Sequence, residues 1–244
     1  MKREKIRKLL LFMMFLLLPI TMWYYSPALI LMGMSEHILT GSFCVFVGMF
    51  VFSMFFGRVF CAYLCPMGCM QDCLSQINDK PAKGGFRNYI KYVIWTIWII
   101  TIAAMYVIGT GKVKVDFFYM TTNGVSIAEV KDFFIYYLVI VLFFLLAIIF
   151  GKRAGCHYIC WMAPFMVLGS KLGKKLHLPQ LHVEADKSKC ISCKKCEKNC
   201  PMGLEVEKLV QTKGTTCCSE CINCGACIDN CPKHVLSYSF KRKS

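Results

Sequence analysis

Long runs of apolar residues alternate with short charged segments along the N-terminal part of the chain. Four runs, at residues 9–35, 38–57, 92–111 and 133–151, contain no Asp, Glu, Lys or Arg. A helix needs about 20 mainly apolar residues to cross a bilayer, and a charge buried there costs at least ~2.5–3.5 kcal/mol. The pattern predicts four transmembrane helices, the first of them bent or ended by Pro19 and Pro27.

The charges between the runs predict how the helices are oriented. Five basic residues precede the first run, and five more (Arg58, Lys80, Lys83, Arg87 and Lys91) separate the second from the third. Of the segments on the opposite side, 33–37 has no basic residue and 112–131 has three. The positive-inside rule therefore predicts a multi-pass protein of the cell's inner (cytoplasmic) membrane with both termini in the cytoplasm. The first run continues past Pro27 without a small-x-small cleavage site, which favours an anchor over a signal peptide.

Composition agrees with a membrane protein and argues against other classes. The 244 residues are 57% hydrophobic and only 18% charged, which is too apolar for an ordinary soluble domain. The net charge of +15 could suggest nucleic acid, but no nucleic-acid-binding motif is present and most basic residues flank the apolar runs or lie in the tail. Membrane topology and docking of an acidic redox partner explain the charge better.

The chain contains an internal repeat around two pairs of cysteines. Residues 57–65 (GRVFCAYLC) and 151–160 (GKRAGCHYIC) share a glycine, a basic residue and then Cys-x-Tyr-aliphatic-Cys. Each copy follows two predicted helices and precedes an apolar stretch suited to a short interfacial or re-entrant helix. The first copy continues directly with Pro66, whereas the second has Trp161 at that position and its proline only at Pro164. Residues 1–170 are therefore predicted to form an all-α transmembrane region of two hairpin-plus-Cys-motif repeats.

The chain has 17 cysteines, and their spacing indicates what they bind. A disulfide framework is typical of small secreted proteins, not of a cytoplasmic domain. Zinc sites use paired Cys-x2-Cys units, whereas the run C-x2-C-x2-C-x3-C-P, in which the fourth Cys ligates the other cluster, is typical of bacterial ferredoxins with two [4Fe–4S] clusters. This run occurs twice, at residues 190–201 and 221–232.

The crossing of the fourth cysteine predicts the ligands of both clusters and the extent of the domain. Residues 190–237 are expected to form a ferredoxin-like α+β domain, after a linker at 171–189 and before a basic tail at 238–244. Cys217 and Cys218 lie outside both runs and are interpreted as packing or spare thiols. The predicted ligands are Cys190, Cys193, Cys196 and Cys231 for cluster 1, and Cys221, Cys224, Cys227 and Cys200 for cluster 2.

The repeated membrane motifs suggest a further metal site. If a pseudo-two-fold axis relates the repeats, Cys61, Cys65, Cys156 and Cys160 converge at the cytoplasmic boundary, where four thiolates suit an iron–sulfur cluster or a tetrahedral metal. The alternative is that these cysteines are buried, inert thiols. The i, i+4 spacing continues through Cys69 and Cys73, which could join the site or only pack. His157, inside the second motif, is more simply a polar interfacial residue than a ligand.

The order of these motifs resembles a known family. A Cys-x3-Cys-Pro motif after a helix hairpin, a second Cys-x3-Cys after another hairpin, and two ferredoxin runs are similar to the NapH-type membrane polyferredoxins, relatives of the membrane part of nitrous oxide reductase regulators. The likeness covers nearly the whole chain and depends most on Cys61, Cys65 and Pro66. It implies an electron-transfer subunit of a quinol dehydrogenase-like oxidoreductase, which exchanges electrons between the quinone pool and a redox partner.

Two other functions remain open at this stage, namely a metal (copper) reductase and a membrane redox sensor. The sequence has no Cys-x2-Cys-His haem signature, and its longest predicted outer segment, 112–131, is too short for a flavin-binding domain. Electrons must therefore pass to another molecule, such as a flavoprotein, a cytochrome or a ferredoxin. Cluster potentials span about −700 to +450 mV, so the direction of electron flow stays open.

Overall fold

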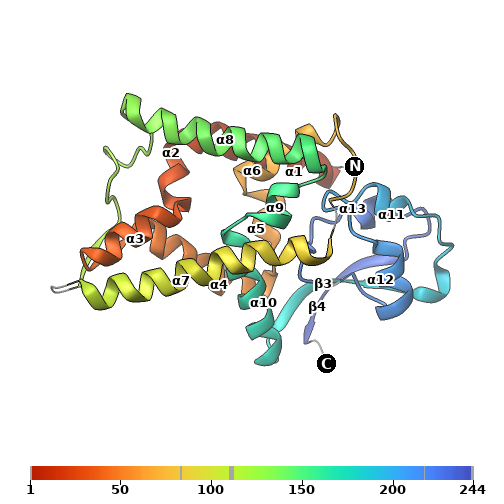
Figure 1. Cartoon of the computed structure of the whole chain (residues 1–244). Coiled ribbons are helices and arrows are strands. Elements are labelled where there is room, and N and C mark those ends of the chain that lie inside the picture. Colours follow the sequence, from red (N-terminus) through yellow and green to blue (C-terminus); the bar gives the residue numbers. More distant parts are fainter. Residues whose placement is uncertain (1, 83, 110–112, 217, 243–244) are drawn as a thin grey trace.

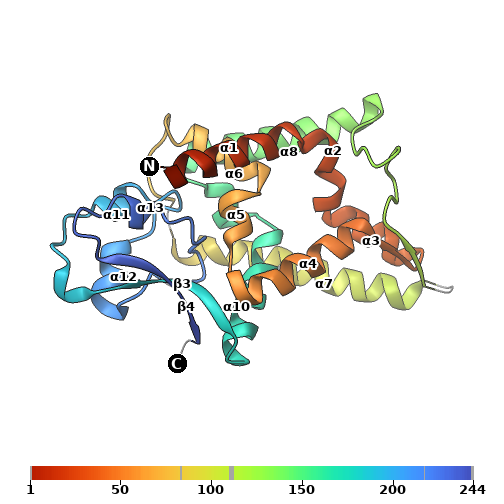
Figure 2. The same cartoon turned by 180° about the vertical axis from the view of Figure 1, so that it is seen from behind.

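The computed structural model describes residues 2–82, 84–109, 113–216 and 218–242. A helical part is followed by a smaller tail domain that lies against one end of it (Figure 1). The N-terminus and the tail domain are at this same end, and the loop that leads into the last long helix is at the other (Figure 2).

The first half of the helical part consists of short helices around one longer one. Its elements are α1 (Lys2–Leu16), α2 (Leu18–Thr21), η1 (Met22–Tyr25), α3 (Pro27–Ser35), β1 (Ile38–Thr40), α4 (Gly41–Phe56), α5 (Val59–Tyr63) and α6 (Pro66–Leu74). The second half has two long helices. Its elements are η2 (Gly85–Tyr89), α7 (Ile90–Ile108), β2 (Lys114–Asp116), α8 (Val130–Phe150), α9 (Ala154–Tyr158) and α10 (Met162–Lys175).

Two helices in the described residues are long and apolar enough to cross a membrane, Gly85–Ile108 and Val130–Phe150. The first apolar run is broken, because Arg3–Leu16 and Leu18–Tyr25 meet at 61° and would make a third span only as one bent pair. The break lies beside Pro19, and Pro27 begins α3, as expected of these prolines. The 16-residue α4 is about 24 Å long, short of the ~30 Å hydrocarbon core. The predicted count of four spanning helices stays a prediction.

The two repeats have the same local structure. In each, a long helix ends at a glycine with positive φ, Gly57 (φ 60°) or Gly151 (φ 91°), a conformation that favours glycine. A five-residue helix follows, α5 or α9, with the first cysteine of the motif as its third residue. The carbonyl before that cysteine then accepts hydrogen bonds from two amides, Leu64 and Cys65 in one repeat and Ile159 and Cys160 in the other.

In each repeat, the helix that follows the Cys motif packs on the long helix of the other repeat. In this arrangement α6 contacts α8, and α10 contacts α4. Small residues permit the close approach of α10 and α4: a β-carbon at Gly169 or Gly173 would collide with the α4 backbone. The long helices begin with ordinary caps, the Thr40 hydroxyl for α4 and a Glu129–Asp132 capping box for α8. The reciprocal packing places α5 and α9 next to each other at the centre of the molecule (Figure 1).

The tail domain is built on one antiparallel strand pair. Its elements are β3 (Pro179–Ala185), η3 (Lys187–Lys189), α11 (Lys195–Lys198), α12 (Val206–Lys213), α13 (Ala226–Asp229) and β4 (Leu236–Arg242). Strand β3 pairs with β4 in a register that joins Pro179 to Arg242 and Ala185 to Leu236. The predicted linker at 171–189 therefore contains the end of α10 and all of β3, and the predicted basic tail at 238–244 contains most of β4.

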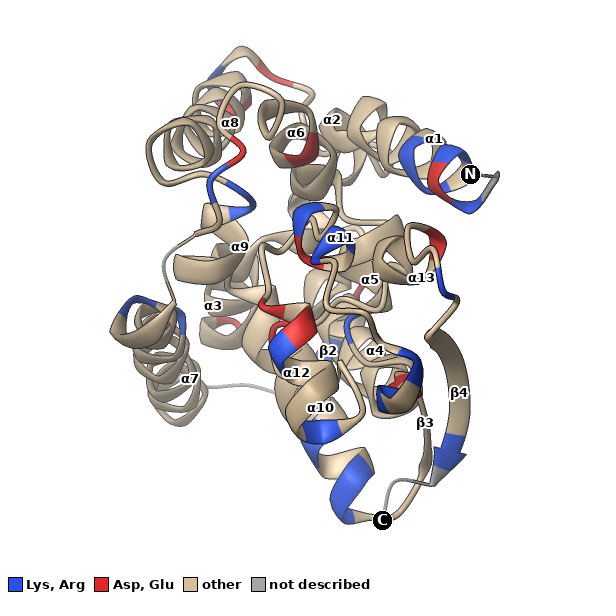
Figure 3. Ribbon diagram, turned by 90° about the vertical axis from the view of Figure 1, so that its right-hand side faces the viewer, with Lys and Arg blue, Asp and Glu red and all other residues tan. Residues whose placement is uncertain are grey.

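Helix α1 also contacts the tail domain. Arg3 forms an ion pair with Asp229 and lies over the ring of Tyr238. The buried Arg7 donates to Asp72 of α6 at 2.7 Å, so the first turns of α1 join α6 to the tail. Figure 3 views this end of the molecule, where Lys and Arg segments lie on α1, α10, α11 and β4.

Candidate metal centres

The cysteines of the two ferredoxin runs line two separate cavities of the tail domain. Each set of four is the one that the crossing of the fourth cysteine predicts. One cavity is lined by Cys190, Cys193, Cys196 and Cys231, and the other by Cys200, Cys221, Cys224 and Cys227. The ligand assignment stays a prediction; none of the 16 described cysteines forms a disulfide.

The backbone of each run repeats one unusual conformation. Ser192 and Lys194 in the first run and Asn223 and Gly225 in the second have φ between 51° and 79°, at matching positions before the third cysteine. Each run then enters a single turn of helix, α11 or α13. Alternation of right- and left-handed residues turns successive N–H groups inward, as in nests that bind anions and iron–sulfur clusters. The cavities thus fit an anionic cluster in both donor type and backbone.

The two sets differ in depth. Cys200 and Cys224 of the second set are buried, whereas Cys193 of the first set is exposed. Burial raises the pKa of the Cys200 thiol to about 11. A buried thiolate therefore requires a positive partner, which iron supplies when its binding releases the thiol proton. The first set lies closer to solvent.

The second set of cysteines lies against the helical part. The Tyr63 hydroxyl, between the two cysteines of the first membrane motif, donates to the Cys224 carbonyl at 3.2 Å. His157 Nε2, in the second motif, donates to the Met202 carbonyl at 3.0 Å, two residues after Cys200. Arg58 donates to the Ser219 carbonyl at 3.1 Å, two residues before Cys221. Both membrane motifs therefore contact the segments that carry the second set.

A buried carboxylate holds this interface together. Glu220 accepts hydrogen bonds from Lys91 Nζ at 2.7 and 2.8 Å and from Arg58 Nη1 at 3.0 Å. Lys91 is fully buried, and Arg58 is 2% exposed. His157 Nδ1 lies 3.7 Å from Glu220, and burial lowers the pKa of His157 to about 4, so the imidazole is neutral. This group of buried charges could not be predicted from the sequence, because its members come from three distant segments.

The four cysteines of the membrane motifs also come together. Cys61, Cys65 and Cys156 are each 3% exposed, and Cys160 is 5% exposed. Burial raises the pKa of the Cys65 thiol, and its proximity to Cys61, Cys156 and Cys160 raises it further. Cys156 and Cys160 likewise interact with each other and with Cys61. Each of the four sulfurs is thus within electrostatic range of the other three.

The other candidates lie apart from these four thiols. Cys69 and Cys73 line a cavity against α1 together with Lys8 and Asp72. The i, i+4 spacing from Cys61 to Cys73 does not lie on one helix, because α5 ends at Tyr63 and α6 begins at Pro66. His157 is directed at Met202 and Glu220 and has no thiol partner in the described residues. Cys218 lines a cavity beside α10, and Cys217 lies outside the described residues.

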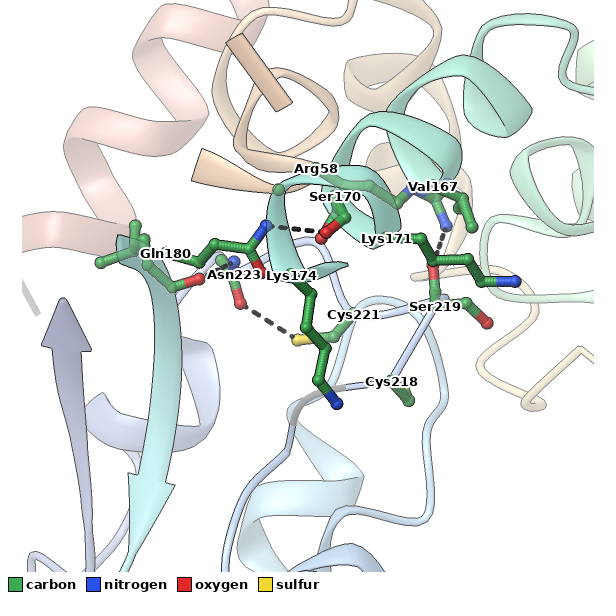
Figure 4. Close-up of a pocket in the computed structure, with 12 residues that line it drawn as sticks. Arg58, Val167, Ser170, Lys171, Lys174, Gln180, Cys218, Ser219, Cys221 and Asn223 are labelled. Carbon is green, nitrogen blue, oxygen red and sulfur yellow. Dashed lines mark hydrogen bonds between the residues drawn. The ribbon is translucent and has the colours of Figure 1, made fainter. Parts of the chain in front are cut away.

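Two cavities lie where the helical part meets the tail domain. One, of ≈200 Å³, is lined by residues including Arg58, Lys174 and Cys221. Figure 4 shows Lys174 extending from α10 toward the segment that carries Cys218 and Cys221. The other, of ≈520 Å³, is lined by Gly85, Asn88, Tyr89, Tyr92, Lys171, Ser219 and Glu220.

Comparison with known proteins agrees with these observations. A family model described as "4Fe-4S binding domain" matches residues 39–83 and again 133–179, one match in each repeat. A model described as "4Fe-4S dicluster domain" matches residues 182–232. These matches support [4Fe–4S] clusters in this chain.

Three curated relatives extend the likeness. The Escherichia coli protein named "Putative electron transport protein YccM" is 24% identical over 88% of this chain and 69% of its own length. Two further relatives are from Methanocaldococcus jannaschii. The one named "Uncharacterized protein MJ0750" is 25% identical over 80% of this chain and 78% of its own length. The one named "Uncharacterized protein MJ0749" is 26% identical over 66% of this chain and 58% of its own length. No solved structure matches. Together with the domain matches, the first relative supports an iron–sulfur electron-transfer protein.

Proposed function

We propose that the protein passes electrons between the quinone pool and a redox partner protein at the cytoplasmic face of the inner membrane. In this proposal the four apolar runs lie in the bilayer and the tail domain is cytoplasmic. The main support is the unequal placement of the two cysteine sets. The second set, in which Cys200 and Cys224 are buried, lies against both membrane motifs, whereas the first includes the exposed Cys193. Electrons would exchange with the membrane through one and with the partner through the other.

The chain's own residues set the conditions for this transfer. When bound, the clusters supply reversible one-electron chemistry. The protein buries Cys200 and Cys224 of the second set and fixes this set against the helical part through Tyr63, His157 and Glu220. Burial and hydrogen bonding to cluster sulfurs are the means by which a protein adjusts cluster potentials.

The cavity of ≈520 Å³ is suited to a quinone ring. It lies at the start of α7, where an apolar helix meets the tail domain, so a lipid-soluble ring could enter from the bilayer surface. Tyr89 and Tyr92 supply aromatic surface. Asn88 Oδ1 is buried and has no hydrogen-bond partner among the described residues, so it could accept from a quinol hydroxyl.

Replacing Asn88 with alanine is expected to slow reduction of the clusters by quinol about tenfold, the effect of one lost hydrogen bond to a bound ring. The measurement is the bleaching of the iron–sulfur absorbance after addition of menaquinol or ubiquinol analogues to membranes that contain the protein. Gln211→Ala, an exposed amide on α12, is the control. No quinol-dependent bleaching in the wild type would reject the quinone proposal and favour the metal-reductase or sensor functions.

The surface around the first cysteine set is basic. Four lysines are exposed there: Lys194, Lys195, Lys198 and Lys233. Three of them, Lys194, Lys195 and Lys233, also line the cavity of that set. Complementary charge accelerates the encounter of redox proteins. The proposed partner is therefore an acidic flavoprotein, cytochrome or ferredoxin that docks at this face.

Reversing two of these charges, Lys194→Glu with Lys195→Glu, is expected to slow electron exchange with an acidic ferredoxin or flavodoxin on the order of tenfold or more at low salt. The difference from the wild type should shrink as salt rises, because exposed charges are screened. Stopped-flow kinetics at several ionic strengths would measure it, with Lys208→Glu on α12 as the control. Equal rates for the wild type and the double variant at low salt would place the docking face elsewhere.

A further inference from the structure

We propose that Cys61, Cys65, Cys156 and Cys160 together hold a third [4Fe–4S] cluster, shared between the two repeats. Each repeat contributes two thiols from an identical turn, and the proposal does not depend on the identity of the donor or the partner. The model described as "4Fe-4S binding domain" matches both motifs, and the proposal adds the ligands and the sharing of one cluster between the repeats.

The first observation is an unsatisfied cation beside the four thiols. Arg58 is 2% exposed, and its Nε and Nη2 groups have no hydrogen-bond partner among the described residues. A buried donor without an acceptor costs free energy, and more so on a charged group. Cys61, Cys160 and Cys156 are all within electrostatic range of this guanidinium. An anion bound by the thiols would provide the missing partner.

The second observation is an excess of buried positive charge. Asp72 lies between Arg7 and Arg153, and Glu4 pairs with Arg7 as a second carboxylate, so the two buried cations of this group are balanced; Lys8, which also pairs with Glu4, is exposed. Glu220 lies between Arg58 and Lys91, and the ion pairs of the described residues give that group no second carboxylate. One buried cation remains uncompensated. A cubane with four thiolate ligands is an anion and would compensate it.

The third observation is that the two repeats hold the cysteines from both sides. Arg153 Nη1 donates to the Cys61 carbonyl at 2.8 Å, although they belong to different repeats. The fully buried Gln71 of α6 donates to Cys156 Sγ at 3.2 Å and accepts from the Gly155 amide at 2.9 Å. A β-carbon at Gly68 would lie 3.2 Å from both Arg153 and the Cys61 carbonyl, so glycine leaves room for this contact. The two repeats thus hold the cysteines from both sides, and Gln71 donates a hydrogen bond to one of the sulfurs.

A single metal ion and an iron–sulfur cluster need different spacings of their four thiolate ligands. Four thiolates around one ion at about 2.3 Å lie within roughly 4 Å of one another. No group of three or more His, Cys, Asp or Glu side chains in the described ranges is gathered closely enough to hold one ion. The same is true of the two ferredoxin sets, whose spacing is typical of clusters. In this respect the membrane set and the two ferredoxin sets are alike among the described residues.

Metal content of the full-length protein tests the proposal. After anaerobic reconstitution with iron and sulfide, the wild type should contain about 12 irons and 12 sulfides per chain, and Cys61→Ser or Cys160→Ser about eight of each. The double variant, Cys61→Ser with Cys160→Ser, should also retain about eight irons, because both residues serve one cluster. Cys44→Ser and Cys73→Ser, two exposed cysteines of α4 and α6, are the controls and should match the wild type. The eight remaining irons show that each variant still folds its tail domain.

A second variant tests the role of Arg58 without removing a ligand. Arg58→Gln should keep the iron content but shift the potential of one cluster to a more negative value, because reduction adds negative charge and the nearby cation is gone. Potentiometric titration followed by electron paramagnetic resonance would resolve the three clusters. About eight irons in the wild type, equimolar zinc, or a further loss of four irons in the double variant would overturn the proposal.

Discussion

Glu220→Ala is expected to release the tail domain from the helical part. The substitution leaves Arg58 and Lys91 buried without their shared carboxylate. Loss of one member of a buried ion pair typically costs about 3–5 kcal/mol, a large fraction of the stability of a domain. Limited proteolysis of the full-length protein in detergent should therefore cut between α10 and β3 at least a hundredfold faster than in the wild type.

The matched control for this variant is Glu205→Ala, which removes a carboxylate that is mostly exposed and pairs with the exposed Lys208. Exposed ion pairs contribute about 1 kcal/mol or less. Glu220→Gln should behave like the alanine variant, because its neutral amide cannot compensate two cations. Equal cleavage rates for Glu220→Ala and Glu205→Ala would show that the buried carboxylate does not hold the interface.

Cys200→Ser is expected to abolish the cluster held by the second ferredoxin run, although Cys200 belongs to the first run. The cavity lined by Cys200 also contains Cys221, Cys224 and Cys227. Since this set contacts both membrane motifs, its loss should stop quinol-driven reduction of the other tail cluster. The iron–sulfur absorbance spectrum of Cys200→Ser should match that of Cys221→Ser. A variant with both substitutions should lose no further cluster.

The reciprocal variant provides the comparison. Cys231→Ser should remove the cluster near solvent, together with electron exchange with the acidic partner, and leave quinol-driven reduction of the deeper cluster intact. The two variants separate the membrane step from the partner step. If Cys200→Ser damaged the same cluster as Cys190→Ser, the fourth cysteines would not cross and the electron path proposed above would be wrong.

Features fixed by short spacing could be predicted from the sequence. The repeat, the two ferredoxin runs and the bends at Pro19 and Pro27 all follow from residues close together in the chain. The extent of a helix was less predictable where a proline intervenes. Cys65 precedes Pro66, which disfavours helical backbone, and its ψ of 115° is extended. The i, i+4 spacing through Cys61 and Cys65 therefore does not reflect one helix.

Contacts between distant segments could not be predicted in this way. The pairing of β3 with β4 converts a predicted linker and tail into the sheet of the domain. The buried group of Arg58, Lys91 and Glu220 joins three segments more than 30 residues apart. At the sequence level, Lys91 and Arg58 counted only as charges that set orientation. Their burial follows from tertiary packing, which spacing alone does not encode.

The reciprocal packing of the repeats has a consequence for their ancestry. Helix α6 contacts α8 while α10 contacts α4, so each long helix packs against the other repeat, and neither repeat supplies more than two of the four central thiols. A chain with a single repeat could complete this arrangement only as a symmetric dimer with an isologous interface. Duplication and fusion would turn that subunit interface into the interior of one chain. The two halves could then diverge, as Pro66 and Trp161 have, while the thiols at their shared axis remain paired.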